Sequence, residues 1–282
     1  MGKPMKIWLI AAALLIFVGL TVFAVSMSIN GWDFTKLATE KYVTNTYELS
    51  EDFSGINVIT DTADVILMPS DDGKAKVVCY EDEKEKHTVN ISNGTLLVEI
   101  TDTKVWYEHI GIGFKAPKIT VYLPEGEFAD LAIETDTGDV DIPNGFGFNK
   151  IFVSVSTGDV TVSGVKCSGE ISVNVSTGNV KLTDTTCKNV VSNGSTGDIT
   201  FKNFIAAEKI TVERSTGDVS FDGADAKELS VKTDTGDVTG SLLTEKVFIT
   251  KSDTGDIEVP KTVNGGRCEI SSDTGDIRIR IQ

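Results

Sequence analysis

The chain has 282 residues, of which 24% are charged and 40% hydrophobic, a balance typical of a globular protein and not of a disordered one. Its formal net charge is −16 and its pI is about 4.5. Such acidity excludes the strongly basic surfaces that bind nucleic acid, and it disfavours adsorption to an anionic membrane surface. We therefore expect no nucleic-acid partner.

The first 29 residues predict a membrane anchor. Residues 7–25 contain no charged side chain, and two lysines precede them. A run of this length can cross a hydrocarbon core of about 30 Å, and basic residues before it predict a cytoplasmic N-terminus. We expect a cytoplasmic segment over 1–6, a transmembrane helix that acts as a signal anchor over 7–29, and residues 31–282 outside the cell membrane. A cleaved secretory signal with a site near Ala24-Val25-Ser26 is the alternative, and it would export the same remainder.

A linker and a short β-region are expected next. Residues 30–50 are interpreted as a juxtamembrane linker and 51–130 as an N-terminal β-region. Its segment Asp61-Thr62-Ala63-Asp64-Val65 is a degenerate copy of a motif that recurs later, and it predicts a first rung. The other expected strands cover 76–80, 88–91, 96–100 and 118–123, and the middle two form a hairpin across Asn93-Gly94. The charged run 81–86, beside His87, is interpreted as a solvated loop.

Residues 131–282 repeat one motif eight times. Each copy has Thr-Gly, then Asp or Asn, then Val or Ile, and successive copies are 19 or 20 residues apart. Apolar residues lie mostly six and four positions before each Thr, and three and five positions after it. This pattern predicts two short strands with one buried face, joined by a glycine turn. One such unit cannot bury its inner face alone, so we predict an all-β fold, a parallel β-solenoid or β-helix with rungs of about 20 residues.

The residue after each corner glycine is acidic in every copy but one, which has Asn179. Stacking would bring these like charges within about 4.8 Å of one another. Two interpretations stay open. The side chains bind their own turn backbone and face water, or they form weak calcium sites, because hard cations take carboxylate oxygens. The calcium candidates are Asp139, Asp159, Asp198, Asp218, Asp237, Asp256 and Asp276. No other cofactor is expected.

Two cysteines occupy the same position in adjacent rungs. Cys167 and Cys187 each lie ten residues after their Thr. Their Cα atoms would be about 4.8 Å apart, which is within disulfide range, and export permits oxidation. Ala206 and Ala226 hold this position in the next two rungs, so a pair of buried free thiols is the alternative.

The sequence is poor in catalytic motifs. It has two histidines, His87 and His109, and it contains no HExxH, GxSxG or Walker sequence. We therefore expect no enzyme. Trp106 and Tyr107 are the best aromatic candidates for partner binding, because the rungs from residue 131 onward have only Phe as an aromatic residue. The alternative is that both pack in the core over the first rungs.

The last residues predict an open strand edge. Residues 277–282 alternate Ile with Arg or Gln. An unpaired edge invites another strand, so this segment is a candidate for end-to-end self-association or for strand addition by a partner. The alternative is that Arg278 and Arg280 protect the edge.

The combination of one membrane segment, Gly31-Trp32-Asp33-Phe34, the segment Ile119-Thr120-Val121-Tyr122-Leu123-Pro124 and repeated Ser-Thr-Gly-Asp-Val resembles a known bacterial family. It is the putative-adhesin family of β-strand-repeat domains, of the domain-of-unknown-function 4097 type. The resemblance covers about residues 30–282. It implies a cell-envelope protein, with some relatives linked to envelope stress, and it carries over no catalytic residues. We expect a membrane-anchored extracytoplasmic module that binds an envelope or cell-surface protein or glycan. The alternatives are an enzyme acting on envelope polysaccharide and a passive spacer.

Overall fold

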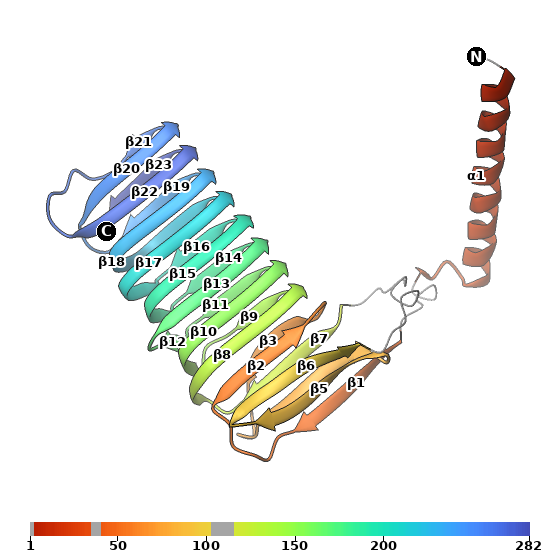
Figure 1. Cartoon of the computed structure of the whole chain (residues 1–282), viewed down its shortest axis with the longest axis horizontal. Coiled ribbons are helices and arrows are strands. Elements are labelled where there is room, and N and C mark those ends of the chain that lie inside the picture. The colour runs from red at the N-terminus through yellow and green to blue at the C-terminus, as the bar shows by residue number, and fades with distance from the viewer. Residues whose placement is uncertain (1–2, 35–40, 103–115) are drawn as a thin grey trace. The chain divides into compact units, whose positions relative to one another are not determined.

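The computed structural model describes residues 3–34, 41–102 and 116–282, which fall into two units. The first unit contains the N-terminal helix, and the second contains the strands β1 to β23. Each unit is described by itself (Figure 1).

Helix α1 (Lys3–Ile29) confirms the predicted apolar helix. Within it, Met5–Ile29 has a mean hydropathy of 2.7 and could cross a membrane by length and composition. Within this unit, the side chains of 12–25 are exposed. A helix that is apolar around its whole circumference needs an apolar environment such as lipid. Gly31, at φ +67°, follows the helix end in the left-handed conformation that glycine adopts without strain.

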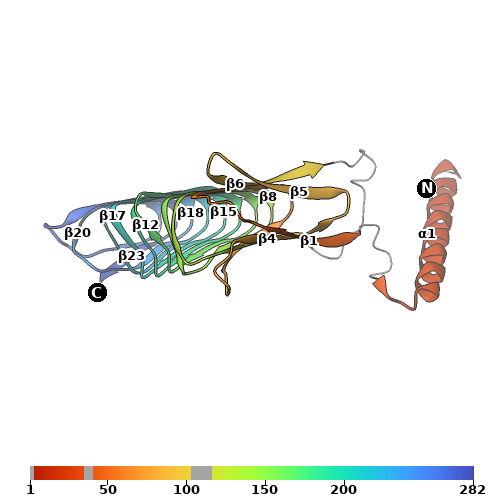
Figure 2. The same ribbon diagram turned by 90° about the horizontal axis from the view of Figure 1, so that it is seen from below.

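The second unit is built from two sheets that face each other and are joined by corners (Figures 1 and 2). Sheet B contains, in spatial order, β5 (Glu85–Ser92), β6 (Thr95–Asp102), β2 (Gly55–Thr60), β8 (Gly126–Thr137), β10 (Phe146–Thr157), β12 (Lys166–Cys167) with β13 (Glu170–Thr177), β15 (Thr186–Thr196), β17 (Ile205–Thr216), the second half of β18 (Val219–Thr235), β22 (Gly266–Thr274) and β20 (Lys246–Thr254). Sheet A contains β1 (Tyr42–Glu48), β4 (Lys76–Asp82), β7 (Lys118–Leu123), β3 (Asp64–Pro69), β9 (Val140–Ile142), β11 (Val160–Ser163), β14 (Val180–Thr183), β16 (Ile199–Lys202), the first half of β18, β19 (Val238–Leu242), β23 (Ile277–Ile281) and β21 (Ile257–Glu258).

Equivalent residues of successive rungs lie side by side, as the repeat predicted. Thr157 pairs with Thr177, and Ile151 pairs with Ile171, on parallel strands. One inner column of sheet B is buried throughout and contains Leu131, Ile151, Ile171, Val190, Ile210, Leu229 and Cys268. Full burial of an aliphatic side chain stabilises the fold by roughly 1.5–3 kcal/mol, and the columns run through the whole stack. The predicted parallel β-solenoid is confirmed.

Close stacking of the corners requires glycine. Gly217 has a φ of +146°, which side chains rarely adopt. A Cβ at this residue would also overlap the carbonyl oxygen of Gly197 in the neighbouring rung. The same overlap arises at the other stacked corners, Gly158, Gly178, Gly197, Gly236, Gly255 and Gly275. The glycine of the Thr-Gly-Asp corner is therefore required for each rung to pack against the next.

The N-terminal end follows the prediction with one correction. β2 and β3 form the first rung, and β5 and β6 form the predicted hairpin, whose turn residues Asn93 and Gly94 both have positive φ. The linker predicted over 30–50 is wrong in part, because Tyr42–Glu48 forms β1 antiparallel to β4. This segment is rich in β-branched and aromatic residues, and its side chains alternate in burial as those of an edge strand do.

The C-terminal rungs are not stacked in sequence order. The last rung, β22 and β23, lies between β18–β19 on one side and β20–β21 on the other. The predicted open edge at 277–282 is therefore wrong in part: Ile277 and Arg278 pair on both sides, whereas the rest of β23 pairs with β19 alone and keeps one open side. The seven residues 259–265 are long enough to bring the chain back by one rung, from β21 to the start of β22. Among the described residues, β20 is the free edge of sheet B at this end, and self-association through 277–282 stays a prediction.

Candidate functional site

The corner side chains form a continuous hydrogen-bonded ladder. The carboxylate of Asp198 accepts the backbone N–H of Asp218 at 2.9 Å, and the carboxylate of Asp218 accepts that of Asp237 at 2.8 Å. Asn179 fits the ladder because its amide oxygen accepts the N–H of Asp198 at 3.0 Å. The other acceptor-to-donor links join Asp64 to Asp139, Asp139 to Asp159, Asp159 to Asn179, Asp237 to Asp276 and Asp276 to Asp256. The ladder gives these side chains a structural role, and calcium binding by the seven predicted carboxylates stays a prediction.

The two stacked cysteines are free thiols in the structure. Cys167 and Cys187 are both buried, and the pairing of β12 with β15 sets them on adjacent rungs. The Cys167 thiol donates to the carbonyl oxygen of Asn149 at 3.4 Å. Burial, and then the neighbouring Cys167, raises the pKa of the Cys187 thiol to about 12. Because the thiolate is the reactive form, such burial slows oxidation, and the disulfide stays a prediction.

The predicted site residues are not brought together at one point. The acidic ladder follows one corner of the stack, and the cysteine pair lies on another part of each rung. Trp106 and Tyr107 lie outside the described residues, so their role in partner binding stays a prediction. Within the described ranges, three metal-binding side-chain types lie within 4.8 Å of one another only at Cys79, Glu81 and His87.

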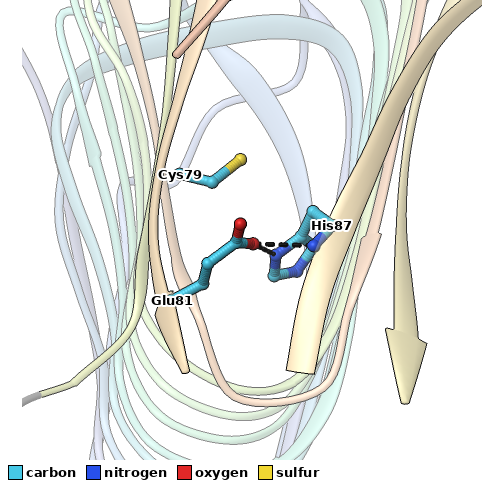
Figure 3. Close-up of side chains that lie close together, drawn as sticks. All are labelled: Cys79, Glu81 and His87. Carbon is cyan, nitrogen blue, oxygen red and sulfur yellow. Dashed lines mark hydrogen bonds and ion pairs between the residues drawn. The ribbon is translucent and has the colours of Figure 1, made fainter. Parts of the chain in front are cut away.

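These three side chains face one another in the core near the N-terminal end of the stack (Figure 3). Cys79 and Glu81 are two residues apart on β4 of sheet A, so both point to the same inner face. His87 comes from β5 of sheet B, on the other side of the hairpin turn. Their exposed fractions are 0%, 1% and 3%, so the cluster is closed to solvent.

His87 connects Glu81 to Thr60. Nδ1 of His87 lies 2.7 Å from Oε2 of Glu81, and its Nε2 lies 2.9 Å from Oγ1 of Thr60. Oε2 of Glu81 also accepts the backbone N–H of His87 at 2.6 Å, while Oε1 accepts Nδ2 of Asn45 at 2.5 Å. The hydroxyl of Tyr47 donates to the carbonyl oxygen of His87 at 3.0 Å. Strands β1, β2, β4 and β5 therefore all contribute to one polar network.

Burial and hydrogen bonding act on the Glu81 carboxyl in opposite directions. Burial raises its pKa, but the hydrogen bonds from His87 and Asn45 outweigh burial and hold the pKa below the ordinary value. For Cys79, burial first and the neighbouring Glu81 carboxylate second raise the pKa of the thiol to about 12. The cluster therefore combines a stabilised carboxylate, an imidazole and a protonated thiol.

This chemistry suits either a buried structural network or a metal centre. The chain Thr60–His87–Glu81 has the hydrogen-bonding order of a nucleophile, a base and an orienting acid. All three members are buried, however, which leaves no room for a substrate. A thiol, an imidazole and a carboxylate are also the three ligand types that zinc accepts. A metal ion needs no exposed surface once it is bound, so burial favours a metal centre over a catalytic triad.

The sequence alone did not identify this cluster. The run 81–86 was predicted to be a solvated loop, and that prediction is wrong at its start, because β4 continues through Asp82 and buries Glu81. A signal was present in the alternation of Val77, Cys79 and Glu81, which places Glu81 on the inward face of the strand. A charge cluster in the sequence is ordinarily solvated, and that expectation outweighed the alternation.

Two parts of the sequence, 53–169 and 168–282, each match the family described as Toastrack DUF4097. The two matches cover most of the chain and all of the stacked corners. The chain belongs to this family. The first Toastrack match contains the Cys79, Glu81 and His87 cluster, and the second contains the C-terminal rungs whose order differs from the sequence.

Solved structures are similar to this Toastrack chain to different degrees. A protein of Parabacteroides distasonis named as a putative lipid binding protein has a TM-score of 0.54 and 13% identity, and the alignment covers 86% of this chain and 98% of that one. A putative adhesin of Bacteroides fragilis has a TM-score of 0.41 and 18% identity, with the same coverage. A putative adhesin of Parabacteroides distasonis has a TM-score of 0.39 and 10% identity, and the alignment covers 85% and 98%. No curated protein matches the sequence. The first likeness supports the fold and carries no function.

Proposed function

We propose that this chain is a single-pass membrane protein whose strand unit faces outward and binds a protein or glycan of the cell envelope, without catalysis. The observation that carries the proposal is α1, which is long enough and apolar enough around its circumference to cross a membrane. Basic residues before it favour a cytoplasmic N-terminus, which leaves 31–282 outside the membrane.

The outer face of sheet B supplies the binding surface in this proposal. A row of polar side chains, each three positions before its corner Thr, crosses neighbouring strands in line and contains Ser154, Asn174, Asn193, Glu213 and Lys232. Nδ2 of Asn193 donates to Oδ1 of Asn174 at 3.2 Å, so the amides are already ordered. Hydrogen-bonding groups about 4.8 Å apart on a flat face suit an extended polymer better than a small molecule, which needs a concave site.

Cysteine labelling on intact cells tests the orientation. Val263 is 86% exposed, so a Val263→Cys variant offers a reactive thiol, whereas the four native thiols are buried. We expect a membrane-impermeant maleimide to label Val263→Cys and to leave a Lys6→Cys variant unlabelled until the cells are broken. Labelling of Lys6→Cys alone on intact cells would reverse the orientation.

Binding of the purified full-length chain in detergent to isolated cell walls and to membrane vesicles, with and without calcium, tests the function. The vesicles are included because a solved structure of this fold carries the name of a lipid binding protein. We expect saturable retention by one fraction, weakened about tenfold by Asn174→Ala with Asn193→Ala through lost hydrogen bonds. The matched control is Thr161→Ala with Thr200→Ala, in strands of sheet A. Equal retention of both variants would exclude the sheet B row, and no retention by any fraction would favour a passive spacer.

A further inference from the structure

The inner face of β4 changes from apolar to ionisable within one strand. Val77 and Cys79 are fully buried, and Glu81 follows them on the same face at 1% exposure. Burying a carboxylate and an imidazole is costly, and replacing such a pair by apolar side chains is often neutral or stabilising. Packing alone therefore does not account for the buried pair of Glu81 and His87. The nearby thiol of Cys79 adds a third group of a type that binds metal ions.

We propose that Cys79, Glu81 and His87 bind one zinc-class divalent cation through the thiolate, a carboxylate oxygen and Nδ1 of the imidazole. The three ligand atoms lie within 4.8 Å of one another. Ligands of a tetrahedral zinc ion are bound at about 2.0–2.3 Å and lie roughly 3–4 Å apart. Nδ1 of His87 and Oε2 of Glu81, now 2.7 Å apart, would therefore separate slightly to admit the ion. On binding, the thiol proton is released to solvent, the imidazole proton is held on Nε2 instead of Nδ1, and metal bonds replace the hydrogen bond between Nδ1 and Glu81.

The groups that would orient these ligands are already in place. Nε2 of His87 lies 2.9 Å from the Thr60 hydroxyl, so with Nδ1 on the metal the Nε2–H donates to Thr60. Nδ2 of Asn45 donates to Oε1 of Glu81 and leaves Oε2 for the ion. Metal-binding histidines and carboxylates are held in this way in protein metal sites. A fourth position remains for water.

The ligand set selects the class of metal. Calcium and magnesium prefer oxygen ligands alone, whereas a thiolate and an imidazole favour zinc and its neighbours among the transition metals. Cys79 and Glu81 belong to sheet A and His87 to sheet B, so the ion would join the two sheets near the N-terminal end of the stack. We therefore expect the metal to stabilise the strand unit, independently of any envelope partner.

Refolding in the presence of metal tests the site, because burial cannot then block entry. The full-length chain in detergent is unfolded with a chelator, separated from it, and refolded with one equivalent of Co²⁺ or Zn²⁺. We expect one Co²⁺ per chain with a thiolate-to-cobalt charge-transfer absorption, and a melting temperature that zinc raises by at least about 5 °C. A refolded wild type with neither signal overturns the proposal.

Matched variants locate the site. Cys79→Val removes a ligand from an aliphatic column and is expected to abolish both signals. Cys268→Val is the control, because Cys268 is also 0% exposed and burial likewise raises the pKa of its thiol to about 12. It is expected to keep both signals. Thr60→Val leaves the ligands in place and is expected to weaken cobalt binding about tenfold. Charge transfer that persists in Cys79→Val, or is lost in Cys268→Val, contradicts the assignment even if one variant folds poorly.

Discussion

At each corner of the stack, glycine and aspartate meet two different requirements. The glycine leaves space for the carbonyl oxygen of the neighbouring corner, and the aspartate accepts the next exposed N–H. Stacked carboxylates about 4.8 Å apart repel one another by roughly 1 kcal/mol even in water. Each ladder hydrogen bond contributes a similar amount in the opposite direction. The row is therefore tolerated, because each carboxylate before the terminal Asp256 accepts a backbone N–H.

Gly217→Ala tests the packing requirement. The new Cβ would overlap the Gly197 carbonyl oxygen and force a strained φ, so we expect a loss of about 3 kcal/mol in the free energy of unfolding. Gly126→Ala is the control, since a Cβ there has no atom within 4 Å. Urea unfolding followed by circular dichroism measures both, and equal midpoints would show that the corners tolerate a side chain.

Substitutions of Asp218 test the ladder. Asp218→Ala leaves the backbone N–H of Asp237 without its acceptor and should cost about 1 kcal/mol. Asp218→Asn keeps an amide oxygen in place, as Asn179 does naturally, and should cost much less. Melting curves with and without millimolar calcium compare the variants. If wild type melts at the same temperature in both solutions, the calcium prediction is excluded, whereas a calcium-induced rise that Asp218→Asn reduces would support it.

The hydrogen bonds of the Asp276 carboxylate determine how its contribution to stability changes at low pH. The N–H of Asp256 first, together with the charge and hydrogen bond of Arg278, holds the pKa of the Asp276 carboxyl below its ordinary value, against burial, which raises it. A lowered pKa means that its contribution is present above the ordinary carboxyl pKa, near 4, and is lost as the pH falls through the lowered value. Asp276→Asn should therefore lose stability less steeply than wild type below pH 4 in melting curves. Parallel curves would exclude this role.

At the scale of elements, the repeat predicted the rungs but not their order. Inward positions such as Ile171 and Ile210 recur with every corner, so the sequence indicates which residues stack. It cannot indicate which rung lies beside which, because every rung presents the same buried apolar positions to its neighbours and could pack against any other rung. The insertion of β22 and β23 between two earlier rungs left no local signal. For the polar cluster, the alternation along β4 indicates that Glu81 faces inward, but it does not indicate that His87 of β5 lies opposite.

One further contact spans three rungs and was also unpredicted. Nη1 of Arg214 donates to the carbonyl oxygen of Val175, two rungs away, at 2.9 Å, and Arg214 is only 3% exposed. The guanidinium occupies the space that a Cβ at Gly194 would need. This arrangement explains why a glycine stands in a strand column that holds Val155 and Val175 in neighbouring rungs.

Engineered disulfides test the C-terminal rung order. Glu269 is the strand partner of Ser230 on one side and of Ile249 on the other. Adjacent strands place Cα atoms about 4.8 Å apart, within disulfide range, whereas a pair two strands apart exceeds the limit of about 7 Å. We expect cysteine pairs at 230 and 269, and at 249 and 269, to oxidise fully, as mapped by mass spectrometry. A pair at 230 and 249 should stay reduced, and its oxidation would support sequence order instead.

At the scale of the strand unit, each rung contacts its immediate neighbours, so stability accumulates along the stack. The two ends differ. The N-terminal end is closed by the antiparallel strands β1, β4 and β5 around the polar cluster. The other end leaves β20 unpaired on one side among the described residues, with Ile249 and Val263 exposed. A stack of this kind should tolerate a change in the number of middle rungs better than a change at either end.

Deletion of one complete rung tests that additivity. Removing residues 159–178 takes out one period of 20 residues and joins Gly158 to Asn179, whose neighbours already stack in the same register through Thr157–Thr177 and Val160–Val180. We expect a folded protein whose urea m-value falls by roughly a tenth, in proportion to the surface that one rung buries. Removing only 159–168 is the control, because it leaves that layer of sheet A without β11. We expect it to unfold at far lower urea. If both deletions unfold the chain alike, the stack is one cooperative whole, and its stability does not add rung by rung.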